Sequence, residues 1–146
     1  MFATSATVNS GVYTRELKKY NQTLEVKEIA CPNWVDIVEN GKYKDTSARA
    51  DIKSHINDMM EFNPEKIILG CTHYPYLLPI LREFAPDIEF IDPAEIFVNY
   101  IKNDMADLLN DNDFSGSEEI FVSANPESFV EHSKIFYSIK NPPTLI

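Results

Sequence analysis

The fold of this 146-residue chain is decided by one stretch, Glu65-Lys66-Ile67-Ile68-Leu69-Gly70-Cys71-Thr72-His73-Tyr74-Pro75-Tyr76. Its apolar run, Ile67 to Leu69, lies between Pro64 and Gly70 and predicts a short buried strand. A thiol, a hydroxyl and an imidazole follow the glycine, and Pro75 then suits the first turn of a helix. A strand, a polar turn and a helix in this order present reactive groups at the carboxyl end of an α/β sheet.

Cys71 is the candidate for chemistry in this turn. A thiolate is favoured by a helix amino terminus or an imidazolium close by, and the predicted helix and His73 supply both. Thr72 could cap the coming helix or donate to an anion. His73 could relay a proton near neutral pH.

The same pattern of strands and helices extends along the chain. Alternating or continuous apolar residues predict strands at 24–29, 67–69, 88–91 and 119–123. Helical spacing predicts helices at 10–20, 33–40, 46–62, 76–84, 94–109 and from Pro126 to about Asn141, with a loop at 111–117 and a frayed end. We expect Ser10 and Thr46 to cap two of these helices. Strands alternating with helices predict an α/β fold with a mostly parallel sheet flanked by helices.

The hexapeptide from Gly70 to Pro75 resembles the signature of glutamate racemases, within the aspartate/glutamate racemase superfamily. His73 resembles the glutamate branch, because aspartate racemases more often carry Glu after Cys-Thr. The segment from Thr4 to Tyr13 is similar to the family's Gly-Thr-x-Ala-Thr-Val motif followed by Ser and Tyr, with Ala3 in place of Gly. The Ala-Cys-Pro at Cys31 is a further family feature.

This resemblance implies a cofactor-independent, two-base interconversion of L- and D-glutamate that supplies D-glutamate for peptidoglycan. Cys71 would be one base, assisted by His73, and no metal or pyridoxal phosphate is implied. Thr4, Thr7, Thr72 and His73 would bind the substrate and stabilise the carbanionic charge with donors already in place. The alternative for Thr4 and Thr7 is that they are ordinary turn and cap hydroxyls.

The family's second catalytic base has no counterpart in the part of a racemase that this sequence resembles. In the family it lies in an earlier Cys-Asn-Thr segment, preceded by an Asp-Ser pair, and neither segment occurs in this sequence. The likeness therefore covers the C-terminal portion of a racemase. It implies one near-complete domain at 1–93, carrying the Thr4, Thr7 and Cys71 motifs, and part of a similar second domain at 94–146. We expect Cys31 to be a buried structural thiol and this chain alone to have little or no racemase activity.

Three other functions stay open. The chain could be a noncatalytic truncated module or partner-binding subunit with exposed apolar surface where a missing half would dock. It could be a cysteine hydrolase using Cys71 and His73, although neighbouring residues on a tight turn rarely face one reacting centre. Among racemases, the aspartate enzyme is the nearest competitor.

Composition limits the class of protein further. Hydrophobic residues make up 44% of the chain, enough for a core, and the net charge of −10 argues against nonspecific nucleic-acid or membrane-surface binding. No apolar run is long enough to span a bilayer, and no basic leader begins the chain. Two cysteines without metal-ligand spacing predict free thiols in the cytoplasm. A small-molecule partner, glutamate, is expected, and a homodimer is left open.

Overall fold

The computed structural model describes residues 1–106 and 118–146, which form two compact units, Met1–Asn99 and Tyr100–Ile146. The expected loop at 111–117 and the last turn of the helix expected at 94–109 lie outside the described residues. Within those residues, no helix is both long and apolar enough to cross a membrane.

The first unit is built on short parallel strands. β1 (Phe2–Ala3) pairs with β2 (Ile29–Ala30), and β3 (Lys66–Ile68) pairs with β4 (Glu89–Ile91). A parallel bridge between Phe2 and Leu69 joins the two pairs, so the strands follow the order β2-β1-β3-β4. The parallel α/β architecture predicted from the sequence is confirmed.

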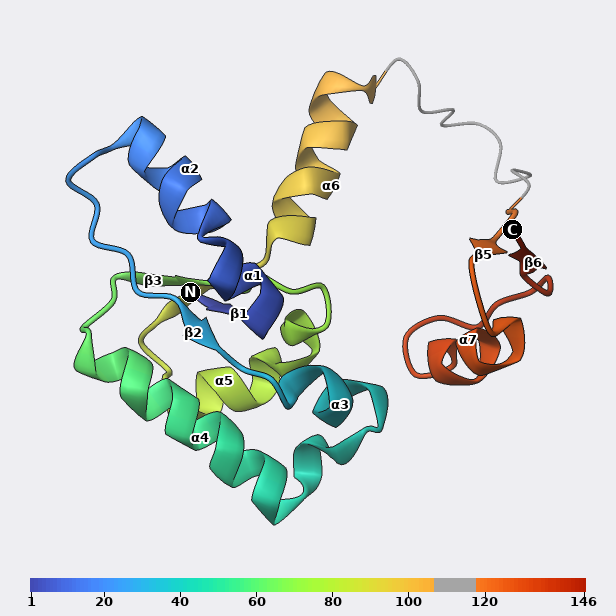
Figure 1. The fold of residues 1–146 in the computed structure, drawn as a ribbon, viewed down its shortest axis with the longest axis horizontal. Helices are drawn as coiled ribbons and strands as arrows, with labels where there is room; N and C mark the ends of the chain where they lie inside the picture. The colour runs from blue at the N-terminus through green and yellow to red at the C-terminus, as the bar shows by residue number, and fades with distance from the viewer. Residues whose placement is uncertain (107–117) are drawn as a thin grey trace. The chain divides into compact units, whose positions relative to one another are not determined.

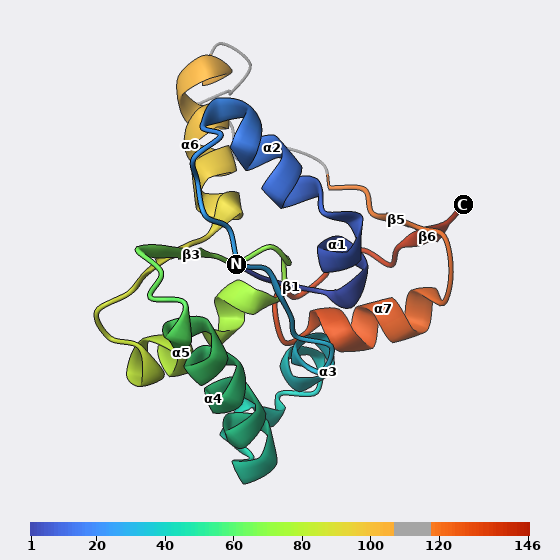
Figure 2. The same cartoon turned by 60° about the vertical axis from the view of Figure 1, so that its left-hand side comes forward.

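Helices cover both faces of these strands. They are α1 (Ser5–Ser10), α2 (Val12–Tyr20), α3 (Trp34–Glu39), α4 (Thr46–Glu61) and α5 (Leu78–Phe84), with 3-10 turns η1 (Lys42–Lys44) and η2 (Tyr74–Leu77). α6 (Pro93–Asp104) follows β4, has no buried residue and continues past the end of this unit. Figures 1 and 2 show α1 and α2 on one side of the strands and α3, α4 and α5 on the other. The alternation of strand and helix thus produces a layered unit with the strands in the middle.

The core lies between the strands and the α3–α5 layer. Trp34 is fully buried, and its ring centroid lies 4.9 Å from that of Phe2 and 5.0 Å from that of Tyr74. Ile52 and Ile56 of α4 are also buried, at the helical spacing that predicted this face. Burying side chains of this size contributes roughly 1.5–3 kcal/mol each, so this cluster holds the layers together.

Several sequence-based expectations for the first unit were wrong in detail. The strand expected at 24–29 is paired only at Ile29–Ala30, because its partner β1 consists only of Phe2–Ala3. Residues 5–10, most of which lie before the first expected helix, form α1. Asp45, not Thr46, is the N-cap residue of α4, and Ser10 accepts the Val12 N–H although Gly11 is the N-cap residue of α2.

Over residues 118–146, the second unit has one parallel strand pair and a helix. β5 (Phe121–Val122) pairs with β6 (Thr144–Leu145), and α7 (Pro126–Ser133) connects them in sequence. The helix is shorter than the one expected to reach about Asn141, and the segment expected to fray contains β6. Thr144 N–H donates to the Ile120 carbonyl at 2.8 Å, so backbone pairing orders this segment.

We predict that Gly70→Ala destabilises the first unit by about 1–3 kcal/mol, because an added Cβ would overpack the strand junction. That Cβ would collide with Met1 Cε and lie 3.2 Å from both the Ala3 Cβ and the Phe2 carbonyl oxygen. Urea unfolding measures the change. Gly70→Ala should lower the free energy of unfolding by less when Ala3→Gly is already present, because the Ala3 Cβ that the new methyl would contact is then gone. Equal losses of stability in both backgrounds would contradict this explanation.

Candidate functional site

The candidate site lies where the central strands end. Phe2 is opposite Leu69, and Ala3 is opposite Ala30. Thr4 therefore follows β1, while Cys31 and Cys71 come after the strands on its two sides. Because the strands are parallel, their carboxyl ends share one edge of the sheet. The register therefore brings the start of the Thr4–Thr7 segment beside the turn that carries Cys71.

Cys71 is partly exposed, and its thiol faces an imidazole. Its Sγ lies 3.8 Å from Nδ1 of His73, and Nε2 of His73 lies 3.1 Å from Oε1 of Glu39. Glu39 is the last residue of α3, so the carboxylate reaches the turn from a helix on the α4 side of the strands. Thiol, imidazole and carboxylate thus form one connected line.

The carboxylate determines which histidine nitrogen carries the proton. An ionised carboxylate only accepts hydrogen bonds, so Nε2 of His73 must be the donor to Glu39. In the neutral ring, Nδ1 is then the acceptor, and it is Nδ1 that faces the Cys71 thiol. This arrangement lets the imidazole receive the thiol proton and return it.

Tyr74 fixes the turn in place. It is fully buried, its hydroxyl donates to the Cys31 carbonyl at 2.8 Å, and its N–H donates to the Cys71 carbonyl at 3.1 Å. Burial is the main cause that raises the pKa of the Tyr74 hydroxyl, with the neighbouring cysteines Cys31 and Cys71 adding to it. The phenol therefore stays protonated as a donor, and it ties two strand ends together.

The threonines form a small group of hydroxyls. Thr4 is the N-cap residue of α1, and its Oγ1 accepts the Thr7 N–H at 3.4 Å and lies 3.0 Å from the Thr7 Oγ1. Both are partly exposed, and Thr72 is exposed. Thr72 does not cap the following turn, because the N-cap residue of η2 is His73 and no side chain caps it. The cap role of Thr4 is observed, and a substrate role for all three remains a prediction.

Cys31 has a different environment from Cys71. It is only 1% exposed, and its thiol donates to the Ile29 carbonyl at 3.7 Å. Burial first, and the Asp51 carboxylate second, raise the pKa of the Cys31 thiol. That same carboxylate accepts from Trp34 Nε1 at 3.1 Å and from Asn33 at 3.0 Å, which holds the loop after β2 against α4. Cys31 stays protonated at neutral pH and cannot act as a base there.

Glu39 is the residue that sequence analysis missed. It is 34 positions from His73, so no local pattern links them. The sequence did contain one indication. Glu39 is the last residue of α3, where the helix dipole disfavours a negative charge, so this carboxylate does not stabilise its own helix. Among residues 1–106 and 118–146, no three His, Cys, Asp or Glu side chains converge as metal ligands.

A family model described as Asp/Glu/Hydantoin racemase matches residues 1–101 of the chain. The chain belongs to this family. The matched range contains Thr4, Thr7, Glu39, Cys71 and His73, and therefore the whole of the geometry described above.

Relatives and solved structures agree with this assignment. Glutamate racemase 3 of Caldanaerobacter subterraneus subsp. tengcongensis is 30% identical over 139 residues, covering 92% of this chain and 51% of that protein. The glutamate racemase of Thermus thermophilus, solved with beta-chloro-D-alanine, superposes with a TM-score of 0.81 at 26% identity, over 99% of this chain and 54% of that one. The Francisella tularensis enzyme, solved with D-glutamate, has a TM-score of 0.81 at 23% identity, over 99% and 56%. The chain spans about half the length of the curated relatives it matches.

We predict that iodoacetamide at pH 8 modifies Cys71 and leaves Cys31 intact, because only the first thiol reaches solvent and the second is held protonated by burial. Peptide mass spectrometry of the folded protein distinguishes the two sites. In urea both cysteines should react. Equal labelling of Cys31 in the folded protein would contradict the environments described here.

Proposed function

We propose that this chain carries one of the two bases of a glutamate racemase, and that Cys71 is that base. The observation that supports the proposal most directly is the Cys71–His73–Glu39 line, with contacts of 3.8 and 3.1 Å, on a partly exposed strand end within the matched family region. Thr4 and Thr7 at the same edge supply hydroxyls for the substrate carboxylates.

The proposed step is a single proton transfer. The Cys71 thiolate takes the α-proton of glutamate, which leaves the electron pair on the α-carbon and converts the thiolate to a thiol. The α-proton is a very weak acid, so donors placed beforehand must stabilise the developing charge near the carboxylate. Thr4, Thr7 and Thr72 are the proposed donors. His73, oriented by Glu39, moves the thiol proton to and from Cys71.

Glutamate is the proposed substrate. The Francisella tularensis enzyme that shares this fold was solved with D-glutamate, and the matched relatives carry the name glutamate racemase. His73 after Cys71-Thr72 further favours glutamate over aspartate. We propose a role in supplying D-glutamate for peptidoglycan in the cytoplasm, with residues 1–93 as the racemase domain and 94–146 as part of a second one.

Full racemisation needs a second base on the opposite face of the α-carbon. The only other cysteine of the sequence is Cys31, which is buried and held protonated. We therefore propose that this chain by itself exchanges the α-proton of one glutamate enantiomer and racemises little or none.

This proposal predicts deuterium uptake without inversion. In D2O, one enantiomer of glutamate should gain an α-deuteron, as measured by proton NMR, while chiral chromatography shows little or no interconversion. Cys71→Ser should abolish the uptake because it removes the base, and Cys31→Ser is the matched control that should retain it. Uptake that depends on Cys31, or rapid racemisation by the chain alone, would contradict the proposed roles.

We also predict that Glu39→Gln slows iodoacetamide alkylation of Cys71 by up to about fivefold. The pair is partly exposed, with His73 and Glu39 side chains 28% and 40% accessible, so its contribution should stay within about 1 kcal/mol. Asp36→Asn removes a charge from the same helix, where Asp36 pairs with Lys42, and serves as the control. An equal effect of both substitutions would show a general charge effect, not orientation of His73.

A noncatalytic module is the second candidate. Apolar side chains of α6 are exposed, including Ile96 at 60% and Val98 at 46%, as expected of a surface that a partner covers. The deuterium experiment separates the two functions. No uptake with either enantiomer, together with unchanged behaviour of Cys71→Ser, would favour the noncatalytic module.

A further inference from the structure

Helix α3 makes polar contacts with a different part of the first unit at each of its ends. At the amino end, Asn33 is the N-cap residue and Trp34 begins the helix, and the side chains of both donate to the Asp51 carboxylate of α4. At the carboxyl end, Oε1 of Glu39 accepts from Nε2 of His73. The helix has six residues, roughly 9 Å of length, so a movement of one end displaces the other.

The two carboxylate oxygens of Asp51 bind the two donors separately. Oδ1 accepts from Nδ2 of Asn33 at 3.0 Å, and Oδ2 accepts from Nε1 of Trp34 at 3.1 Å. Trp34 is fully buried and the Asp51 side chain is 24% exposed, so water competes little for the second bond. A carboxylate that holds two consecutive residues restricts both the position of this helix end and its rotation about the helix axis.

His55 is a further ionisable group beside Asp51. Its Nδ1 lies 2.8 Å from the Asp51 carbonyl oxygen and 3.4 Å from Oδ2, and its ring packs edge-on against Trp34 at 5.6 Å. A carbonyl only accepts hydrogen bonds, so Nδ1 of His55 carries a proton and is the donor. Because His55 donates, it leaves the carboxylate as the acceptor for the two donors of α3.

Apolar packing alone does not determine where the Glu39 carboxylate lies. Ile37 and Val38 of α3 are buried, but hydrophobic contacts are non-directional and tolerate small rotations of the helix. The Glu39–His73 contact is directional and measures 3.1 Å, and a hydrogen bond is lost by about 3.6 Å. A shift of roughly half an ångström at this end of α3 is therefore enough to break it, and the Asp51 bonds at the other end oppose such a shift.

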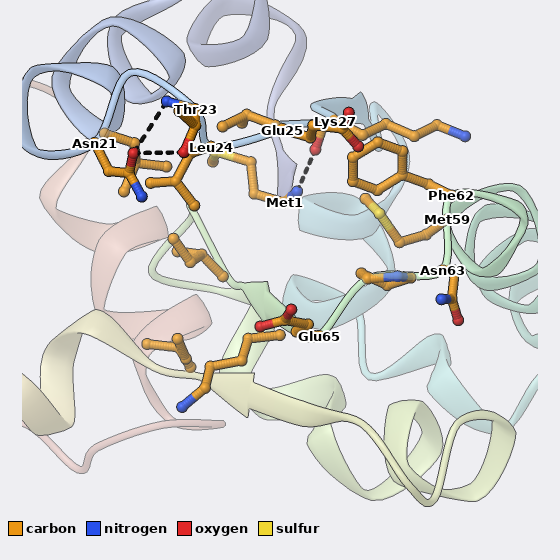
Figure 3. A pocket seen from close by; sticks show the side chains of 16 residues that line it. Met1, Asn21, Thr23, Leu24, Glu25, Lys27, Met59, Phe62, Asn63 and Glu65 are labelled. Carbon is orange, nitrogen blue, oxygen red and sulfur yellow. Dashed lines mark hydrogen bonds between the residues drawn. The ribbon is translucent and has the colours of Figure 1, made fainter.

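The contacts of Asp51 are separate from the pocket that Figure 3 shows. That pocket has a volume of about 480 Å³, and Met59 and Phe62 line it at the end of α4. Asp51 lies about two helical turns before Met59 and, like Asn33 and Trp34, is not among the lining residues. The Asp51 bonds thus belong to the packing of α3 against α4 and not to that pocket.

We propose that Asp51 is a positioning residue of the candidate site, which holds α3 at the angle at which Glu39 reaches His73. The inference rests on the proposed function for the role of Cys71 as a base, and on the contacts above for the path from Asp51 to His73. When the Asp51 bonds are lost, α3 turns, His73 is released from Glu39, and the Cys71 thiol becomes less reactive. No side chain of the Cys71–His73–Glu39 line is itself changed.

The test measures the rate of iodoacetamide alkylation of Cys71 in variants of the whole chain, with folding verified by circular dichroism. Asp51→Ala removes both acceptors and should slow the reaction by about twofold or more, but by no more than Glu39→Gln does. Asp51→Asn should retain most of the original rate, because its amide can accept from Trp34 and donate to a flipped Asn33 amide. This rescue separates positioning from an effect of the Asp51 charge.

Two other variants act as controls on α4. Asp58→Ala removes a carboxylate that pairs with Lys27, and Ile56→Val trims a buried side chain and lowers stability. Neither residue bonds to α3, so both variants should alkylate Cys71 at the original rate. Asn33→Ala removes one of the two donors to Asp51 at an exposed position, and should slow alkylation by less than Asp51→Ala does.

A double variant traces the path through Glu39. In the Glu39→Gln background, Asp51→Ala should slow alkylation no further, because the contact through which it acts is already lost. The inference is overturned if neither Asp51→Ala nor Asn33→Ala slows alkylation, if Asp51→Asn is as slow as Asp51→Ala, or if the two losses multiply in the double variant. Deuterium uptake by the unchanged chain is a separate result: its absence counts against the racemase role, whereas the alkylation rates decide the role of Asp51.

Discussion

The architecture of the first unit depends on a single junction of backbone, where Gly70 N–H donates to the Phe2 carbonyl at 2.8 Å beside the Phe2–Leu69 bridge. This junction joins the β1–β2 pair to the β3–β4 pair. Gly70 permits it, because no side chain stands between the two strands. The same junction aligns the Cys71 turn with Thr4 at one edge of the sheet.

The parts of the fold that sequence predicted are those with a local physical cause. The β3 strand was recognisable because its apolar run lies between Pro64 and Gly70, and α4 because Ile52 and Ile56 recur at helical spacing. α1 was missed because its residues 5–10 are mostly small or polar, and none of them is buried, so no apolar periodicity marks the helix. β6 was missed because its pairing with β5 joins segments more than twenty residues apart, which no local pattern records.

The candidate site divides in the same way. Cys71, His73, Thr4 and Thr7 were found from motifs, since each motif follows a strand and marks a strand end. Glu39 could not be found, because its contact with His73 exists only after α3 has packed beside the Cys71 turn. The contrast between the two thiols also depends on tertiary structure. Cys31 follows β2 and Cys71 follows the β3 strand, on either side of β1, but Cys31 is buried and Cys71 is partly exposed.

Trp34 is the only tryptophan of the chain, and the structure puts it in contact with three separate parts of the first unit. Its ring packs on Phe2 of β1, on Tyr74 of the Cys71 turn and edge-on to His55 of α4, 5.6 Å away. Its indole N–H is held by the Asp51 carboxylate. The tryptophan fluorescence of the protein therefore comes from the point where strand, turn and helix layer meet, and an emission spectrum excited at the indole reports on the integrity of all three.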